Sequence, residues 1–510
     1  MTPRRFLAFT ALALMFVSAQ APLYLFASVP VYIYRDVHGA DHWIWFVSAN
    51  LLATAAISPF VGTLSDVFGR RWVAVMGTVF VIAGQILSSL ATYMDPFIGG
   101  MTLTGVGAGI SELTAIAGTA ELAPVSKRGY YVALMVLTIL PILPACLWAQ
   151  LIASHATWRY IGVFAGGLSV VCLAMTLLFY SPPKPAVQLD SRAKWALLRR
   201  VDVVGGLLSV AGLALFEVGV LGGGYEHPWS SAVVLVPLIL GVVFVAAFVA
   251  WEVWGAKYPM VPRRLGEAPR TLVLTIVITF ISGANFFSVL MIWPTQAYAV
   301  YGDDPIQVGI RGMPFAFGVL GGACISLALI SKLRGNIKWI IFGSSCLMTA
   351  GCGALAAATI DNINTVYALL FISGLGVGGL VVPASTITTL ICPDDLIATI
   401  TALTIAIRLV GGAIGYAIYY NVFVNRLLPT LTEMVGTACF ANGITDVGLI
   451  TEIIGLVGFS LVREVYALPG VTTEQADAIM AAGHQAFADS YPRIYYDISG
   501  FINDQVAVKL

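Results

Sequence analysis

Two ionisable side chains lie deep inside long apolar stretches of the chain. Glu112 falls just past the middle of the run at 97–119, and Arg408 falls near the middle of the run at 397–421. An ionisable group at such a depth in a bilayer is costly and by default indicates a functional site. Burial favours the neutral carboxyl, whereas a nearby arginine favours the carboxylate. We therefore predict that Glu112 carries a proton and that Arg408 is its partner or anchors a substrate. The alternative is a static ion pair that holds the protein together.

Other reactive groupings are missing from the sequence. The seven cysteines show no zinc spacing and predict no disulfide framework. Five scattered histidines form no ligand cluster, no glycine–lysine pair offers a phosphate-binding loop, and no nucleophile–base pair is visible. These absences weigh against an ATP-driven pump and against a membrane enzyme. We expect no cofactor, a proton gradient as the energy source, and no nucleic-acid partner, because no basic block is present.

The composition is that of a chain embedded in lipid. Of 510 residues, 59% are hydrophobic and 10% are charged, whereas soluble domains carry about 25% charged residues. A membrane span needs about 20 apolar residues. Thirteen runs meet this need, and we read the first as a span rather than a signal peptide. They lie at 6–29, 45–65, 73–93, 97–119, 131–153, 160–180, 203–222, 231–254, 272–296, 306–330, 338–358, 365–391 and 397–421.

Basic residues concentrate in alternate loops along ten consecutive spans. The basic loops begin with Arg4 and Arg5, whereas the loops between them hold little beyond Arg35 and Arg159. The positive-inside rule then places the N-terminus in the cytosol. We expect a multi-pass, monomeric protein of the plasma membrane, surrounded by the lipid bilayer.

The polar stretch 62–71, reading GTLSDVFGRR, lies between two spans. Gly62 would let two helices approach closely, because glycine has no side chain. Asp66 could accept charge-assisted hydrogen bonds, and the two arginines mark the cytoplasmic side. The spacing resembles the signature loop between spans 2 and 3 of the major facilitator superfamily; a basic turn that only fixes topology is the alternative. The resemblance implies a cytoplasmic gating loop formed by Gly62, Asp66, Gly69, Arg70, Arg71 and Glu121.

Further motifs resemble the fungal trichothecene efflux pump family, close to the fungal siderophore-iron transporters. They cover nearly the whole chain: Trp43–Phe46, Gly105–Gly109 with Glu112, Trp148–Leu151, Ile281–Phe287, Pro383–Ser385, Ile391–Asp395 and Arg408–Gly412. The resemblance implies an all-α major facilitator fold with two six-helix bundles and two linker helices. Two antiporter patterns depart from the general form. Met101 stands where an arginine begins the pattern in span 4, and Pro141 and Pro144 lack their glycines in span 5.

The resemblance also divides the chain. Its expected parts are a six-span bundle (1–180), a cytoplasmic loop (181–202), two linker spans (203–254), a second bundle with spans 9–13 (255–424), an extracellular loop (425–492) and a tail (493–510). Within the extracellular loop, 447–462 predicts an amphipathic helix, because it is shorter than a span. The tail resembles the family's cytoplasmic end, so a fourteenth span is expected to be missing before it. A gene-model error and a true thirteen-span protein both explain that gap.

In the superfamily the first and fourth spans of each half line a central cavity, which implies that Glu112 lies in its wall. Gln20 in span 1 and Asn285 in span 9 are buried amides that could bind a polar substrate, although bonds between helices explain them equally well. Trp293, with Phe286 and Phe287, could line an apolar pocket or serve only in packing. Arg311 could line the extracellular mouth or pair with Asp303 or Asp304.

The favoured function is secondary transport of a small organic molecule by alternating access, with proton-coupled efflux of a toxin, drug or secondary metabolite. Proton-coupled uptake of an iron–siderophore complex is the second reading, favoured by the large loop at 425–492. A receptor that binds its ligand without translocating it is the third. The intact loop with Asp66, Arg70 and Arg71 argues against the receptor, because that loop serves conformational switching.

Overall fold

The computed structural model describes residues 3–123, 128–182, 202–224, 227–260, 269–302, 304–332, 337–390 and 396–506. Asp303, the motif at 391–395, most of the expected loop at 181–202 and the last residues of the tail lie outside this part. Within it, every named element is a helix, and 12 helices are long and apolar enough to cross a membrane. These match twelve of the thirteen expected spans, and the remaining span, 97–119, lies within the long helix α6 (Met94–Leu122). The expected all-α, multi-pass architecture is therefore confirmed.

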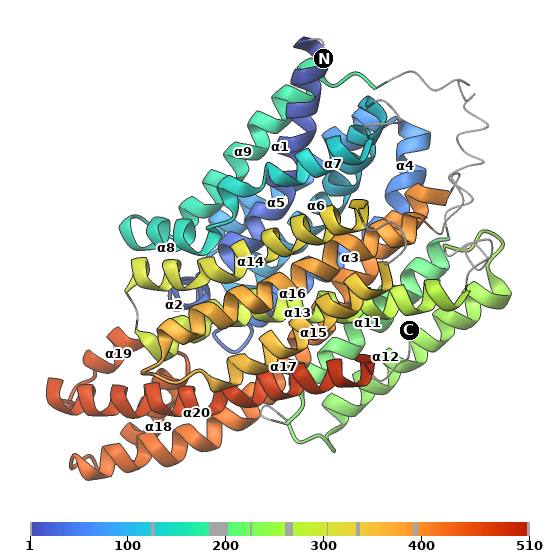
Figure 1. Cartoon of the computed structure of the whole chain (residues 1–510). Coiled ribbons are helices and arrows are strands. Elements are labelled where there is room, and N and C mark those ends of the chain that lie inside the picture. Colours follow the sequence, from blue (N-terminus) through green and yellow to red (C-terminus); the bar gives the residue numbers. More distant parts are fainter. Residues whose placement is uncertain are drawn as a thin grey trace.

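The first half of the chain forms one bundle (Figure 1). Its helices besides α6 are α1 (Pro3–Phe26), α2 (Pro30–Val37), α3 (Ile44–Ile57), α4 (Val61–Phe68), α5 (Arg70–Leu90), α7 (Arg128–Leu137), α8 (Ala145–His155) and α9 (Arg159–Phe179). Two spans are interrupted by short helices that contain proline, η1 (Ser58–Phe60) and η3 (Leu140–Ile142). Proline lacks the N–H that would continue the helical hydrogen-bond ladder. We call the end of the bundle at which α1 begins the N-face, and the opposite end the distal face.

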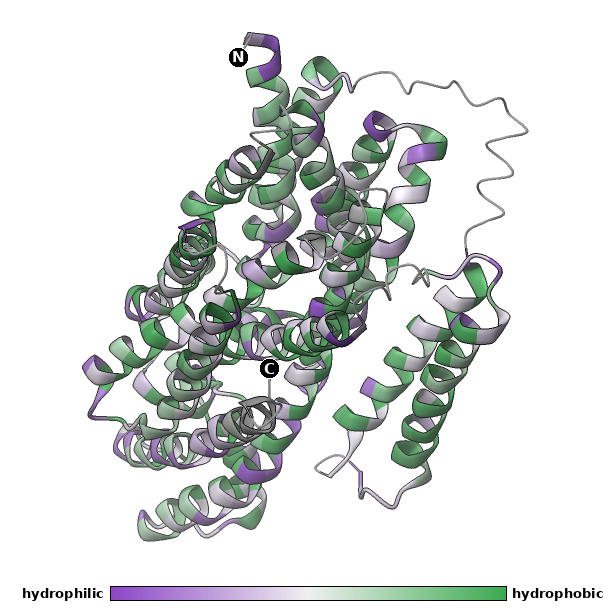
Figure 2. Cartoon of the chain, turned by 45° about the vertical axis from the view of Figure 1, so that its right-hand side comes forward, coloured by the Kyte–Doolittle hydropathy of each residue, from purple (hydrophilic) through white to green (hydrophobic). Residues whose placement is uncertain are grey.

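A separate pair of helices follows. α11 (Val203–Gly222) and α12 (Ala232–Ala250) pack closely, and η4 (Trp251–Gly255) extends α12. Figure 2 shows the pair as two strongly hydrophobic helices set to one side of the bundle. α12 leaves many apolar side chains exposed, such as Val236 and Ile239. In a membrane protein such side chains face lipid, and the pair contacts the bundle mainly through α11, which packs on α3 and α17.

The second half repeats the plan of the first. It contains α13 (Pro269–Tyr301), α14 (Pro305–Lys332), α15 (Ile337–Ala354) with η6 (Leu355–Ala357), α16 (Ile363–Leu390) and α17 (Ile397–Ala441). α14 packs on α16, and α13 packs on α17. Glycines lie at these crossings: a Cβ at Gly378 would collide with the Val319 carbonyl, and one at Gly283 would collide with the Arg408 carbonyl. Small residues at such contacts let helix backbones touch.

The C-terminal region differs from the expected loop. α17 continues as one helix of 45 residues, and α18 (Val447–Gly458), α19 (Val462–Tyr466) and α20 (Thr473–Val506) follow. Residues 425–492 are therefore mostly helical. α18 starts where the amphipathic helix at 447–462 was expected, but it ends four residues earlier, near Ser460, which has a left-handed backbone.

α20 occupies the position of a last span. In the first half, α9 forms the sixth span and packs on α1 and α5, which form the first and third spans. α20 likewise packs on α13 and α15, and it runs back along α17 (Figure 1). A buried stripe at helical spacing holds it there: Ala476, Ile479, Phe487, Tyr491, Ile494 and Tyr495. α20 is not among the 12 apolar helices. In the packing of the second half, a more polar helix therefore stands where a sixth span was expected to be missing.

The glycine at the α14–α16 crossing provides a test of the packing. Gly378→Ala should destabilise the protein by about 1–3 kcal/mol, because overpacking forces backbones apart. Gly343→Ala on α15 is the matched control, since a Cβ there meets nothing within 4 Å. Thermal unfolding of the purified protein would compare the two. Equal melting temperatures for both variants would contradict the close contact.

Candidate functional site

Glu112 and Arg408 meet between the two halves of the molecule. Glu112 lies on α6 and Arg408 on α17, and Arg408 Nη2 is 3.5 Å from Glu112 Oε1. Glu112 is 7% exposed and faces the other half instead of lipid. The distance is that of an ion pair and is too long for a strong hydrogen bond. A single arginine side chain therefore ties α17 to the middle of the first bundle.

Two residues of α1 extend this charged pair into a polar cluster. The Tyr24 hydroxyl donates to Gln20 Oε1 over 2.6 Å. The charges of both Glu112 and Arg408 act on the Tyr24 hydroxyl. We call Gln20, Tyr24, Glu112 and Arg408 the central polar cluster. Gln20 was expected from the sequence, whereas Tyr24 was missed; its spacing of four residues from Gln20, which places both on one helix face, was the available signal.

At the N-face, the predicted turn between α4 and α5 depends on Gly69. Its φ is +86°, a conformation that other residues rarely adopt. The turn points two arginines at the neighbouring helix ends: Arg70 pairs with Glu121 at the end of α6, and Arg71 donates to the Leu177 carbonyl at the end of α9. Asp66 is exposed beside this turn and within reach of the charge of Arg70.

The expected role of Gly62 is wrong. Gly62 is exposed on α4, and a Cβ there would meet nothing within 4 Å. Among the described residues, no helix approaches closely at this position, so the lack of a side chain is not needed for packing. The close contacts of α5 with α6 occur farther along, where a Cβ at Gly84 would collide with the side chain of Thr104.

Asn285 lies within the second half and not in the central polar cluster. It is fully buried on α13. Its amide nitrogen is 3.6 Å from the Met348 sulfur on α15, and its oxygen is 3.5 Å from the Tyr419 hydroxyl on α17. Both partners belong to neighbouring helices of the same bundle. This geometry favours the interpretation that Asn285 links helices over the interpretation that it binds a polar substrate.

Trp293 and Arg311 form one unit near the distal end of α13. The Trp293 indole donates to the Arg311 carbonyl over 2.7 Å. The Arg311 guanidinium donates to the carbonyls of Ala297 and Gly302, and it lies 5.5 Å from the centre of the Tyr301 ring. Within the part of the chain that the structure describes, Arg311 makes no ion pair with Asp304. The unit ties α13 to α14.

Aromatic packing in α13 continues toward α14. The rings of Phe286 and Phe287 are 4.8 Å apart, and Phe286 stacks on Phe315 of α14 with centroids at 6.4 Å. The residues 286 and 287 therefore pack against each other and against a neighbouring helix of the same half.

At the distal face, the last helices of the chain contact the first bundle. The Tyr34 hydroxyl on α2 donates to the Phe459 carbonyl after α18, a separation of 425 residues. Arg35 Nε lies 3.0 Å from Glu464 Oε1 on α19. We call Tyr34, Arg35, Phe459 and Glu464 the distal latch. The sequence analysis missed it, because no local pattern pairs residues so far apart.

Burial raises the pKa of Tyr34 well above its usual range, and nearby Tyr298, Tyr420 and Glu464 add to that effect. Tyr34 therefore stays protonated at physiological pH and remains a hydrogen-bond donor. A second contact between the halves lies close by, where the Trp43 indole donates to the Tyr420 hydroxyl on α17 over 3.2 Å. A third joins α8 to α14, where the Cys146 thiol lies 3.6 Å from the Val308 carbonyl.

Metal-binding groups are not gathered anywhere in the described ranges: no three histidine, cysteine, aspartate or glutamate side chains lie together. The described site residues thus form three groups. They are the central polar cluster, the distal latch, and the turn between α4 and α5 with Asp66, Arg70 and Arg71, which we call the N-face loop. This arrangement offers a charge that can be neutralised between two helical bundles, with contacts at both faces.

Comparison with known proteins gives a consistent result. The family model described as the fungal trichothecene efflux pump matches residues 1–503. The trichothecene efflux pump of Fusarium sporotrichioides is 26% identical over 505 residues, covering 97% of this chain and 83% of that protein. An efflux pump of Aspergillus parasiticus is 25% identical, covering 76% of each chain.

Solved structures show the same fold at low identity. A bacterial homologue of the human lysosomal transporter Spinster, described as inward-facing and unoccupied, superposes with a TM-score of 0.59 at 12% identity, covering 99% of both chains. A D-xylose–proton symporter superposes with a TM-score of 0.54 at 14% identity, covering 82% of this chain and 89% of that one. At such identities the likeness shows the fold alone, which is that of the major facilitators.

The ion pair predicts strong coupling between two side chains. Removing one partner of a buried pair leaves an uncompensated charge and costs roughly 3–5 kcal/mol. Arg408→Gln should therefore destabilise the protein markedly, because it leaves the charge of Glu112 uncompensated. Glu112→Gln should also destabilise it, because it leaves the charge of Arg408 uncompensated. The double variant should lose much less than the sum of the single losses, because neither charge remains.

Denaturant titration of the four proteins (wild type, two single variants and the double variant) would measure this coupling. A matched control cycle that pairs Arg408→Gln with Glu121→Gln should be additive, since Glu121 lies at the N-face with Arg70. Additive losses for Glu112 and Arg408 would show that the two charges do not interact.

Proposed function

The chain belongs to the fungal trichothecene efflux pump family, and from this membership we propose that it exports a small organic molecule by proton-coupled alternating access. It is a multi-pass membrane transporter whose curated relatives are efflux pumps. The description of the family and the name of its Fusarium member favour a trichothecene as the first substrate to be tested.

The observation that carries the proton coupling is the ion pair between Glu112 and Arg408. While Glu112 is ionised, the pair attracts α6 and α17 to each other across the two halves. A proton that binds Glu112 removes the negative charge, and the attraction is lost. Arg408 is then left without its counter-ion and can donate hydrogen bonds to a substrate oxygen or to a water molecule. Release of the proton restores the pair and resets the arrangement.

The contacts at the two faces support alternating access. The distal latch and the α8–α14 contact join the halves at the distal face. The loop with Arg70 and Arg71 joins three helix ends within the first half at the N-face, so this half can move as one body. In the proposed cycle, the distal contacts break when the central pair is neutralised, and substrate leaves on that side.

We further propose that the N-face is cytosolic and that the protein acts as a monomer in the plasma membrane. Arg4, Arg5, Arg70, Arg71 and Lys338 lie at the N-face ends of their helices, which is the distribution expected of a cytosolic side. Export then runs from the N-face to the distal face. An accessible N-terminal epitope in intact cells would contradict this orientation.

Glu112→Gln tests the coupling directly. In sealed vesicles with an imposed pH gradient, the wild type should accumulate a trichothecene only while the gradient lasts. Glu112→Gln should lose that dependence, because the amide cannot exchange a proton. Glu217→Gln is the matched control: Glu217 is another fully buried carboxyl, but it lies on the linker helix α11, outside the central polar cluster. Unchanged gradient-driven transport in Glu112→Gln would reject the proposal.

A disulfide across the halves tests alternating access. A Cβ at Gly312 on α14 would lie 2.9 Å from the Cβ of Cys146 on α8 and 3.2 Å from its sulfur. Disulfides need Cβ atoms about 3.5–4.5 Å apart, so Gly312→Cys should cross-link to the native Cys146 after a slight separation of the helices. The cross-link, identified by mass spectrometry, should stop transport, and a reductant should restore it.

Gly312→Ser controls for the added side chain and should show no response to oxidant. Full transport by the cross-linked protein would mean that α8 and α14 need not separate during the cycle. In that event, the proposed opening at the distal face would be wrong, whatever the role of Glu112.

A further inference from the structure

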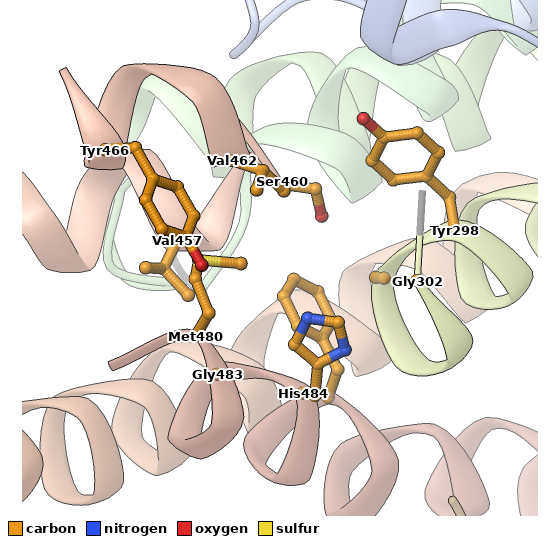
Figure 3. A pocket seen from close by; sticks show the side chains of 11 residues that line it. Tyr298, Gly302, Val457, Ser460, Val462, Tyr466, Met480, Gly483 and His484 are labelled. Atoms are coloured by element: carbon orange, nitrogen blue, oxygen red, sulfur yellow. The ribbon is translucent and has the colours of Figure 1, made fainter. Parts of the chain in front are cut away.

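A small cavity lies at the distal face, away from the central polar cluster. It is open on one side, has a volume of about 180 Å³, and is lined by the end of α13, by α18 and α19, and by α20 (Figure 3). The side chains that matter for its chemistry are Tyr298, Ser460, Tyr466, Met480, His484 and Phe487. All of them belong to the second half and the helices that follow it. Neither the central polar cluster nor the N-face loop contributes to this cavity.

His484 offers a fixed hydrogen-bond acceptor to the cavity. Its Nδ1 lies 3.2 Å from the Val300 carbonyl oxygen. A carbonyl can only accept, so Nδ1 must carry the hydrogen, and in the neutral ring Nε2 is then an acceptor. Figure 3 shows the imidazole pointing from α20 into the cavity. The contact with Val300 therefore sets both the tautomer and the direction of the ring.

Ser460 faces the same space from the opposite wall. Its φ is +55°, in the left-handed region where glycine is the usual residue at a helix end. A serine in that conformation is strained, and such strain concentrates at functional positions. Ser460 is 6% exposed, and its hydroxyl has no hydrogen-bond partner among the described residues. Figure 3 shows this hydroxyl directed into the cavity.

The remaining walls are apolar. Phe487 and Met480 are buried beneath the cavity, and Val457 closes one side. Tyr466 is 42% exposed and forms the rim. Its hydroxyl donates to Asp477, which holds the ring in place and uses up the hydrogen of the phenol. A small molecule can therefore enter past Tyr466 and meet His484 and Ser460 on a mostly apolar surface that also includes Tyr298.

The volume limits the size of an occupant. An engineered apolar cavity of about 150 Å³ binds benzene, whereas pockets for drug-sized ligands start at about 300 Å³. A cavity of about 180 Å³ therefore fits one six-membered ring with a small substituent.

We propose that this cavity is a binding site for a neutral single-ring molecule with one hydrogen-bond donor, such as a phenol. The ring packs against Phe487 and Met480, and its hydroxyl donates to His484 Nε2. Ser460 donates its own hydrogen to the same ligand oxygen. The proposal does not depend on the transport function, because it involves none of the residues of the central polar cluster.

Binding of 4-fluorophenol tests the site. The full-length protein in lipid nanodiscs should give saturable broadening of the ¹⁹F signal of this probe. His484→Phe keeps a ring of similar size but removes the acceptor, and it should weaken binding about tenfold, the value of one good hydrogen bond. Met480→Trp should abolish binding by filling the cavity. Fluorobenzene, which has no donor, should bind the wild type more weakly than 4-fluorophenol.

Glu112→Gln is the control that separates this site from the transport site. It should lose gradient-driven transport and still bind 4-fluorophenol normally. Loss of probe binding in Glu112→Gln would place the probe in the central region and overturn the proposal. Equal binding by the wild type and Met480→Trp would overturn it as well. So would tighter binding of the cation tetramethylammonium than of the phenol, because the proposed ligand is neutral.

Ser460→Gly distinguishes a ligand-binding role from a structural one. Glycine removes the backbone strain, so the melting temperature of the protein should rise. The same change removes the hydroxyl, so 4-fluorophenol should bind severalfold more weakly. A more stable protein with unchanged probe affinity would remove Ser460 from the site, and a less stable one would refute the account of its strain.

Discussion

The structure depends on one charged contact placed where charge is least tolerated. Glu112 and Arg408 lie 3.5 Å apart at mid-depth between two helical bundles, and neither charge is favourable there without the other. The pair therefore attracts the two halves to each other for as long as Glu112 is ionised. In the proposed cycle, one proton removes that attraction, because Glu112 is the only acid in the central polar cluster. Protonation of Glu112 would then control how the two halves pack against each other.

Such a control needs halves that move as units, and the packing within each half provides them. Helices cross at glycines with their backbones in contact, as at Gly378 against Val319 and at Gly283 against Arg408. The Gly69 turn directs Arg70 and Arg71 onto the ends of α6 and α9, which ties the N-face of the first bundle together. Contacts between the halves include the distal latch and the packing of α8 on α14 and of α3 on α17. In the proposed cycle, motion occurs between the bundles and not within them.

Much of this could be predicted from local sequence, and the rest depended on long-range contacts. The spans follow from apolar length alone, and Glu112, Arg408 and the turn at Gly69 follow from polar or glycine residues in unusual places. α20 was missed because its buried stripe alternates with polar residues, which lowers its hydropathy although Tyr491 and Tyr495 are fully buried. The distal latch joins residues 425 positions apart, and no local pattern reveals such a pair. Gly62 was misread because glycine permits close packing without requiring it.

The most direct test of this account is the distance between the halves at each face, measured by electron–electron resonance between spin labels. Labels at His42 and Val447 would report on the distal face, and labels at Trp72 and Trp339 on the N-face; all four side chains are exposed. Glu112→Gln mimics the protonated carboxyl. If the ion pair controls the arrangement, this variant should lengthen the distal distance and shorten the N-face distance relative to the wild type. Unchanged distances at both faces would contradict the claim that this pair governs the two halves.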